Sequence, residues 1–155
     1  MKTKTLICLL ALACLLAVPA TAQVNYAVSG GSAYVTRSPN ASGNIVIAST
    51  YQGKSVIYIE AAAFNSCFSL RNVTIPNSVT SIGNNAFSYC TSMTNVTIPN
   101  SVTNIEVFAF AVCASLTNIS VAAANVVYSS LDGVLFNKAQ TILFQFPAGR
   151  ARDRV

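Results

Sequence analysis

The most informative absence in this sequence is histidine, which does not occur among its 155 residues. Without an imidazole, Ser-His-Asp and Cys-His catalytic arrangements and histidine-ligated metal sites are excluded. Acidic residues are also scarce, because there are only four: Glu60, Glu106, Asp132 and Asp153. Asp132 precedes Gly133 in a turn signal, which favours a structural role. We therefore expect no enzymatic activity, no cofactor and no metal ion.

Clustered positive charge is missing from the body of the chain. Only 8% of the residues are charged, and the net charge of +5 is concentrated at the two ends, in Lys2, Lys4, Arg150, Arg152 and Arg154. Nucleic-acid binding requires lysines and arginines gathered over a folded surface. The sequence therefore predicts no nucleic-acid partner.

Long hydrophobic runs are confined to the N-terminus. Two lysines precede the apolar segment Leu6 to Val18, and Ala20-Thr21-Ala22 is a small-x-small pattern. This order is typical of a signal peptide cleaved after Ala22. Pro19 disfavours an uncleaved anchor, and the residues before Cys14 match a lipoprotein signal poorly. No other run approaches the ~20 residues that span a bilayer, so we expect a secreted or cell-surface protein without a membrane span once residues 1–22 are removed.

An internal repeat of 23 residues organises the rest of the chain. Eight columns of similar residues keep this spacing over three copies: Val56, Val79 and Val102; Ile59, Ile82 and Ile105; Ala63, Ala86 and Ala109; Phe64, Phe87 and Phe110; Cys67, Cys90 and Cys113; Leu70, Met93 and Leu116; Val73, Val96 and Ile119; Ile75, Ile98 and Val121.

The two halves of each repeat have different periodicities. Val96-Thr97-Ile98 alternates apolar and polar residues, which indicates a half-buried strand, and Pro99 marks its end. Ala86, Phe87 and Cys90 follow the spacing of a short helical turn. Such a unit cannot bury its own apolar face, but stacked coils share a continuous core. The sequence therefore predicts an α/β solenoid with short parallel β-strands and short helical turns.

The flanks of the array predict two caps. Residues 23–55 contain short strand patterns around a Gly-rich turn, and Ile45-Val46-Ile47 matches Val73-Thr74-Ile75 as a degenerate first strand. We expect a β-rich N-terminal cap there, three repeats over residues 56–124, and a β-hairpin over residues 125–147. Residues 148–155 show no repeat pattern, which indicates either a polar tail or a truncated end.

The three cysteines of the repeats form one column, Cys67, Cys90 and Cys113. No Cys-x-x-Cys pair exists, and three thiolates without a fourth ligand are a poor zinc site. Neighbouring coils would allow a disulfide, although an odd count leaves one thiol unpaired. We interpret the cysteines, together with Phe64, Phe87 and Phe110, as a buried core ladder.

Two polar columns are expected on the solvent side of the strands. If Val73 points inward, the outward residues are Asn72, Asn95 and Asn118, and Thr74, Thr97 and Ser120. Repeat proteins use such faces for extended binding, so these six residues are the candidate binding face. Glu60 and Glu106 share another column, with Gly83 between them, and could loosely flank a sugar or a cation. We interpret them as solvated charges at a corner.

The unit Asn-Ser-Val-Thr-Ser-Ile-Gly-Asn-Asn-Ala-Phe-Ser-Tyr-Cys-Thr-Ser-Met-Thr-Asn-Val-Thr-Ile-Pro, residues 77–99, resembles the BspA-type leucine-rich repeats of bacterial surface proteins. The resemblance covers about residues 45–147. It implies a non-enzymatic binding or adhesion module with an extracellular protein or glycan as partner. The alternative is a structural spacer, or a fragment of a longer surface protein, without a ligand of its own.

The chain departs from the general leucine-rich pattern after each strand. Serines occupy the place of the usual Asn or Cys, at Ser55, Ser78 and Ser101. We expect their hydroxyls to bond backbone groups in the turn.

Overall fold

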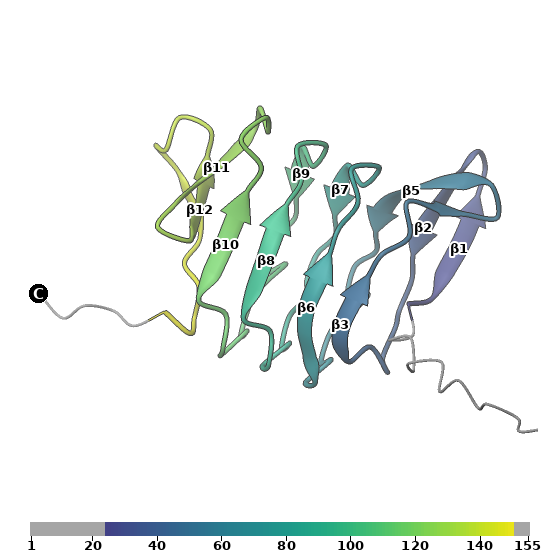
Figure 1. The fold of residues 1–155 in the computed structure, drawn as a ribbon, viewed down its shortest axis with the longest axis horizontal. Helices are drawn as coiled ribbons and strands as arrows, with labels where there is room; N and C mark the ends of the chain where they lie inside the picture. Colours follow the sequence, from purple (N-terminus) through teal and green to yellow (C-terminus); the bar gives the residue numbers. More distant parts are fainter. Residues whose placement is uncertain (1–23, 151–155) are drawn as a thin grey trace, which may run out of the picture.

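The computed structural model describes residues 24–150. The predicted signal peptide at residues 1–22 lies outside the described residues, as do residues 151–155 at the end of the polar tail. Within the described range the chain winds into stacked coils, and their strands lie side by side along the long axis of the molecule (Figure 1).

One side of the stack is a parallel sheet made of the strands that the alternating pattern predicts. Its order is β10 (Asn118–Val121), β8 (Asn95–Ile98), β6 (Leu70–Thr74) and β3 (Gly43–Val46). Asn118 pairs with Asn95, and Asn95 pairs with Asn72, so the register advances by one repeat per coil. Ile45 pairs with Val73, as expected for a degenerate first strand.

A second parallel sheet lies on another side of the stack, where the repeat pattern predicts no strand. It contains β5 (Lys54–Ile59), β7 (Ser81–Ile82) and β9 (Asn104–Ile105), and β2 (Ser32–Val35) extends it beyond β5. The pairs Ile59–Ile82 and Ile82–Ile105 hold the apolar column in register. Two-residue strands have too short an alternation to be recognised from sequence.

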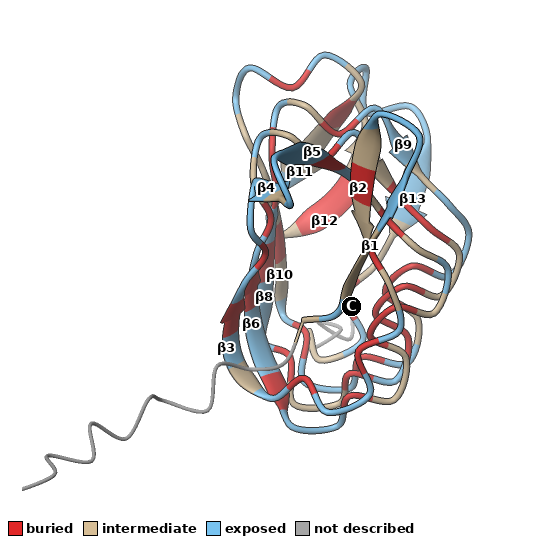
Figure 2. Ribbon diagram, turned by 90° about the vertical axis from the view of Figure 1, so that its right-hand side faces the viewer, coloured by how far each residue is buried: buried red, intermediate tan, exposed pale blue. Residues whose placement is uncertain are grey.

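The third side of each coil is a chain of turns over residues 60–67, 83–90 and 106–113, and the described residues contain no helix. The predicted short helical turns, and the α/β class with them, are wrong. The fold is a solenoid of strands and turns of about four coils. Figure 2 looks along the stack and shows these turns opposite the sheet of β3, β6, β8 and β10.

Left-handed backbone at two positions per coil explains why no helix forms. The φ angle is 56° at Ala62 and 63° at Ser66, and it is positive at the equivalent residues of the next two coils, Asn85, Tyr89, Phe108 and Val112. Successive backbone N–H groups of the segment then point alternately into their own coil and toward the next coil. Ala63 donates within its own coil to Glu60 O (3.2 Å), whereas Phe64 donates to Ala86 O of the next coil (2.7 Å). A helix would turn every N–H back into its own coil, leaving none for the neighbour.

The core runs through the stack as ladders of like residues. Phe64, Phe87 and Phe110 are at most 2% exposed. Their rings stack, with centroids 5.0 Å apart between the first two and 5.5 Å between the second two. Cys67, Cys90 and Cys113 are also at most 2% exposed. Stacked rings of this kind add to the free energy of burying the side chains.

The N-terminal end of the core is covered by irregular structure and two hairpins. β1 (Tyr26–Ser29) pairs antiparallel with β2, and β4 (Thr50–Tyr51) pairs antiparallel with β5 across the turn Gln52-Gly53. Buried Ser38 donates its N–H to Ala63 O (2.6 Å), in the manner of a preceding coil. The cap therefore covers the middle outward carbonyl of the first turn segment.

The C-terminal end is formed by three antiparallel strands, β11 (Tyr128–Leu131), β12 (Val134–Asn137) and β13 (Leu143–Gln145). The sequence indicates the hairpin of β12 and β13, and the turn Asp132-Gly133 joins β11 to β12. This unit covers the outer edge of β10, where Ile119 N–H donates to Gly133 O (2.9 Å).

We expect Val112→Gly to stabilise the protein. A β-branched residue at a φ of 56° is strained, by roughly 1–2 kcal/mol, whereas glycine adopts this conformation freely. Allowing for the greater entropy of an unfolded glycine, we expect the free energy of unfolding to rise by up to about 1 kcal/mol. Urea unfolding followed by circular dichroism measures the change.

Val107→Gly is the matched control, because Val107 is also exposed in this segment but does not have a positive φ. Its free energy of unfolding should fall by about 0.5–1 kcal/mol. A Val112→Gly variant no more stable than the original chain would contradict the assignment of strain.

Candidate functional site

The outer face of the β3–β6–β8–β10 sheet carries the six residues of the predicted binding face. Asn72, Thr74, Asn95 and Thr97 are exposed there. Asn118 and Ser120 on β10 are only half-exposed, because the β11–β12 unit lies against that strand. Asn118 Oδ1 lies against Gly133, and Ser130 Oγ accepts Val121 N–H (3.2 Å). The sheet therefore offers four open positions rather than six.

Side chains on this face bond one another along the columns. Asn72 Nδ2 donates to Asn44 Oδ1 (2.7 Å), and the hydroxyls of Thr97 and Ser120 lie 2.9 Å apart. These two bonds hold Asn72 and Thr97, whereas Asn95 Nδ2 donates to the adjacent Thr94 Oγ1 (2.9 Å). The residues of each column repeat about every 4.8 Å, the spacing of neighbouring strands. A repeated row of uncharged donors and acceptors can form hydrogen bonds with a glycan or with an extended protein backbone.

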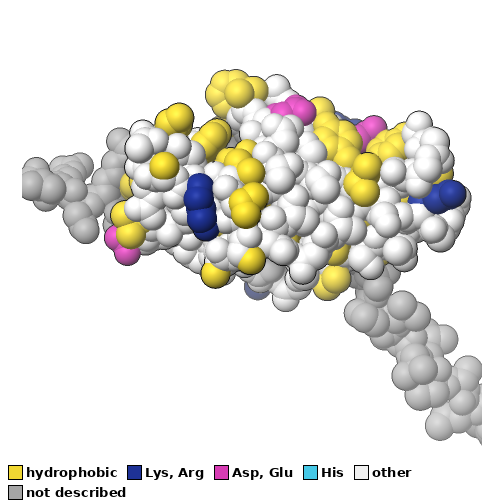
Figure 3. Space-filling view, turned by 90° about the horizontal axis from the view of Figure 1, so that it is seen from above, with side chains coloured by type: hydrophobic (Ala, Val, Ile, Leu, Met, Phe, Trp, Pro, Cys, Tyr) yellow, Lys and Arg dark blue, Asp and Glu magenta, His cyan; other side chains and the backbone are white. Residues whose placement is uncertain are grey.

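Charge is sparse on the surface of the solenoid. Seen from above in Figure 3, the molecule shows a few isolated charged side chains among polar and apolar ones. Among the described residues there is no group of three or more cysteine or acidic side chains that could hold a metal ion. The same residues include no helix long and apolar enough to cross a membrane.

Each cysteine of the core ladder is a free thiol that bonds to the preceding coil. Cys90 Sγ donates to Phe64 O (3.2 Å), and Cys113 Sγ donates to Phe87 O (3.1 Å). Phe64 O and Phe87 O also accept the backbone N–H of the cysteine in their own coil. The thiol therefore supplies a second donor to a buried carbonyl, which an aliphatic side chain of similar size cannot do.

Burial controls the ionisation of these thiols. It raises the pKa of Cys113 to about 11. It raises the pKa of Cys90 further, with a smaller contribution from the neighbouring Cys113 and Cys67, and it also raises the pKa of Cys67. Because the thiolate is the reactive form, thiols that stay protonated inside the core are poor nucleophiles and poor metal ligands.

The acidic column is arranged around a tyrosine hydroxyl. A Cβ on Gly83 would lie 2.6 Å from both the Tyr58 hydroxyl and Ala61 N, so only glycine fits between Glu60 and Glu106. Glu106 Oε2 accepts Asn84 N–H (2.9 Å). Burial raises the pKa of Tyr58, as do Glu106 and Glu60 in that order. The Tyr58 hydroxyl thus lies against Gly83, the residue between Glu60 and Glu106 in this column.

Of the three serines expected to bond the turns, Ser101 does so, because its Oγ donates to Val79 O (2.6 Å). The expectation is wrong for Ser78, whose Oγ is buried and has no partner among the described residues. Ser55 is exposed on β5.

The polar residue that bonds most backbone here is Asn125, which the sequence presents only as a break in the valine column. It is 1% exposed. Its Nδ2 donates to Pro99 O (2.8 Å) and Val102 O (2.9 Å), and its Oδ1 accepts N–H groups from Val127 and Tyr128.

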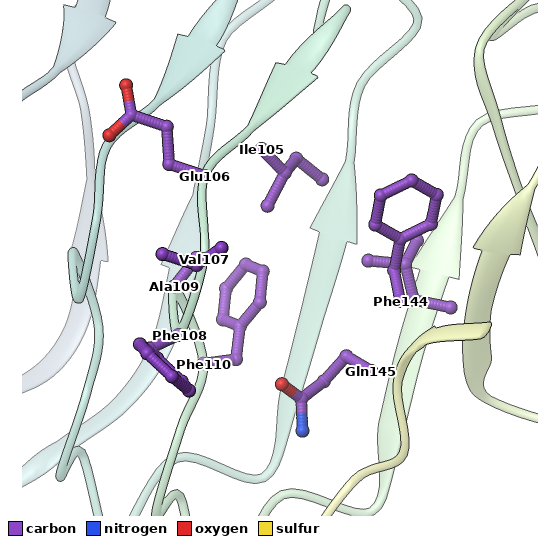
Figure 4. A pocket seen from close by; sticks show the side chains of 9 residues that line it. Ile105, Glu106, Val107, Phe108, Ala109, Phe110, Phe144 and Gln145 are labelled. Carbon is purple, nitrogen blue, oxygen red and sulfur yellow. The ribbon is translucent and has the colours of Figure 1, made fainter. Parts of the chain in front are cut away.

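A cavity of about 360 Å³ opens beside the last coil, and sequence reasoning does not find it. It lies between the turn segment after β9 and the strand β13, with Phe110 on one wall and Phe144 on the other (Figure 4). Its other lining residues are Ile105, Glu106, Val107, Phe108, Ala109, Leu135 and Gln145. The available sequence signal is the run Val107-Phe-Ala-Phe-Ala-Val, which is more apolar than the equivalent runs of the earlier coils.

Coils of 23 residues, each contributing one strand to a long parallel sheet, with a shared ladder core, define a leucine-rich-repeat solenoid. Residues 43–147 match the family described as BspA type leucine rich repeat region, in six copies. The chain belongs to this family of leucine-rich repeats found in bacterial surface proteins.

Solved structures with the same repeat come from several bacteria. The chain is similar to a leucine rich repeat protein of T. pallidum, with 30% identity and a TM-score of 0.58 over 62% of this chain and 46% of that one. A leucine rich cell surface protein of Faecalibacterium prausnitzii is 32% identical, with a TM-score of 0.58 over 70% of this chain and 27% of that one. The pneumococcal vaccine antigen PcpA is 26% identical, with a TM-score of 0.51 over 66% of this chain and 31% of that one. The chain thus spans less than half the length of each. No functionally curated protein matches it.

The raised thiol pKa values predict a loss of stability in alkali. An unfolded cysteine ionises near its ordinary value of about 9, whereas folded Cys113 keeps its proton up to about pH 11. Between these values the unfolded chain binds fewer protons than the folded chain. The free energy of unfolding should therefore fall by about 1.4 kcal/mol per pH unit for each such thiol.

Chemical denaturation under reducing conditions between pH 7 and pH 10.5 measures this slope. Cys113→Ser should keep a donor toward Phe87 O. Because this variant has one titrating thiol fewer, its free energy of unfolding should fall less steeply with pH, by about 1.4 kcal/mol per pH unit. Equal slopes in the variant and the original chain would contradict the assignment to Cys113.

Proposed function

We propose that this chain is a secreted or cell-surface, non-enzymatic binding or adhesion module, and that the outer face of β6 and β8 contacts an extracellular protein or glycan. The observation that carries the proposal is the pair of exposed polar columns, Asn72 with Asn95 and Thr74 with Thr97. Rows of fixed, uncharged hydrogen-bonding groups favour partners with a matching repeat, such as polysaccharides or extended backbones.

The chemistry of the face sets the expected strength of binding. The two open columns on β6 and β8 carry no aromatic or arginine side chain, and such side chains supply much of the energy in tight protein interfaces. Each contact is therefore weak, and useful affinity comes from several repeats acting together. The Faecalibacterium relative is described as a cell surface protein, which is consistent with the signal peptide predicted for residues 1–22.

A structural spacer is the second candidate function. The columns already bond one another through Asn72 with Asn44 and Thr97 with Ser120. A face whose groups satisfy each other gains less from a ligand, and such a module would only separate other domains of a surface protein.

The binding face is tested by Thr74→Lys combined with Thr97→Lys, assayed on arrays of glycans and extracellular-matrix proteins. Two bulky charges on the exposed columns should weaken binding at least 10-fold. The matched control is Thr80→Lys with Thr103→Lys, which places the same charges at exposed positions outside this face. If the original chain binds nothing, the spacer function holds. Equal binding by both variants would exclude this face.

Export is tested separately. When the full chain is expressed in a bacterial host, the protein recovered outside the cytoplasm should begin at Gln23, by N-terminal sequencing. A product that retains residues 1–22, or that stays in the cytoplasm, would contradict cleavage after Ala22.

A further inference from the structure

The last coil has an open backbone edge along its turn segment, residues 106–113. In the coil before it, three alternate N–H groups donate to this segment at 2.8 to 3.3 Å, from Asn85, Phe87 and Tyr89. The equivalent N–H groups of the last coil belong to Phe108, Phe110 and Val112, and they donate to no residue within 24–150. The edge therefore presents three donors at the spacing with which each coil binds the next.

Side chains on this segment are larger and more apolar in the last coil than in the earlier coils. The three turn segments read Ala-Ala-Ala-Phe-Asn-Ser, Asn-Asn-Ala-Phe-Ser-Tyr and Val-Phe-Ala-Phe-Ala-Val. Val107 is 62% exposed and Phe108 is 65% exposed, whereas the middle coil has asparagines at both places. Exposed hydrophobic groups gathered at one place are typical of an interaction surface.

The strand β13 faces this segment across the cavity and is apolar as well. Thirteen large hydrophobic side chains are exposed among the described residues. Three of them lie in residues 106–113 (Val107, Phe108 and Val112), and three lie in β13 or directly before it (Ile142, Leu143 and Phe144). The cavity of about 360 Å³ lies between them (Figure 4). Ile105, whose equivalents Ile59 and Ile82 are fully buried, is left partly exposed there.

A second copy of this chain is a poor occupant for the edge. The matching acceptors would be the three outward carbonyls of the first turn segment, and the middle one, Ala63 O, already accepts Ser38 N–H. Cys67 Sγ donates to Ser38 O (3.3 Å), and Ser38 is 0% exposed, so this cap is built into the core. Symmetric pairing of two open ends would place donors against donors.

We propose that the open end of the last coil, residues 106–113 together with β13, is a docking site for a segment of a different protein that carries no acidic side chains, which binds as an additional coil. Its alternate carbonyls accept the N–H groups of Phe108, Phe110 and Val112. A large aromatic side chain enters the cavity and stacks on Phe110, as Phe87 does on the other side at 5.5 Å. Among the described residues, Glu106 is the only charged one that lines the cavity, so acidic segments are disfavoured.

This mode is edge addition, in which backbone hydrogen bonds supply affinity and pockets select side chains. It uses the end of the solenoid rather than the sheet face, so it stands independently of the proposed function.

The probe is a synthetic peptide of residues 81–91, with alanine at position 90, which carries the middle coil's acceptors and Phe87. It is titrated into the ¹⁵N-labelled chain, and amide hydrogen exchange is followed by NMR. In the free protein the amides of Phe108, Phe110 and Val112 should exchange at least 10-fold faster than that of Phe87. The peptide should slow all three and leave Phe87 unchanged.

Two controls locate the site. A peptide with alanine in place of Phe87 should bind at least 10-fold more weakly. The protein variant Phe108→Asp should also bind the original peptide at least 10-fold more weakly. The control variant Phe68→Asp, at a residue 58% exposed in the first coil, should bind it as the original chain does.

Three results would overturn the proposal. One is protection of the three amides in the free chain, which would mean that the edge is already covered. The second is a failure of the peptide to bind the protein at millimolar concentration. The third is a Phe108→Asp variant that binds the peptide as tightly as the original chain does.

Discussion

The bonding of each coil to the next is the constraint on which this structure depends. A 23-residue unit leaves alternate N–H groups of its turn segment without partners of its own, as with Phe64, whose N–H bonds Ala86 O of the next coil. Unpaired backbone groups are costly once they are buried. The array is therefore stable only as a stack in fixed register, and that register places like residues above one another in the core.

Register also explains the chemistry of the interior. Cys90 and Cys113 each donate to the carbonyl of the phenylalanine one coil earlier, and Cys67 donates to Ser38 O, while all three remain buried. Desolvation raises the pKa of the Cys90 and Cys113 thiols and keeps them protonated. The cysteine column thus belongs to the same network of inter-coil bonds as the backbone, and the groups available to partners lie on the outer face and at the ends.

The unpaired backbone groups at the two ends of the stack are covered in different ways. At the N-terminal end, Ser38 supplies the N–H of a missing coil and is itself held by Cys67. At the C-terminal end, Asn125 and Tyr128 satisfy the backbone beside β9, where Tyr128 Oη accepts Ile105 N–H (2.9 Å). Within residues 24–150 the turn segment of the last coil has no such cover, and its side chains are apolar. This asymmetry distinguishes the cavity end of the molecule from the rest of its surface.

Residue spacing and alternation are enough to predict the 23-residue period, the core columns, the pairing of Ile45 with Val73 and the hairpin of β12 with β13. The absence of helix from the turns is visible only in the folded chain, since left-handed φ angles at Tyr89 or Val112 leave no mark on residue type. The fold also places Asn125 as a buried cap, half-covers Asn118 and Ser120, and opens a cavity beside Phe144. These features arise where segments distant in sequence meet, and a repeat pattern describes each coil without its neighbours at the ends.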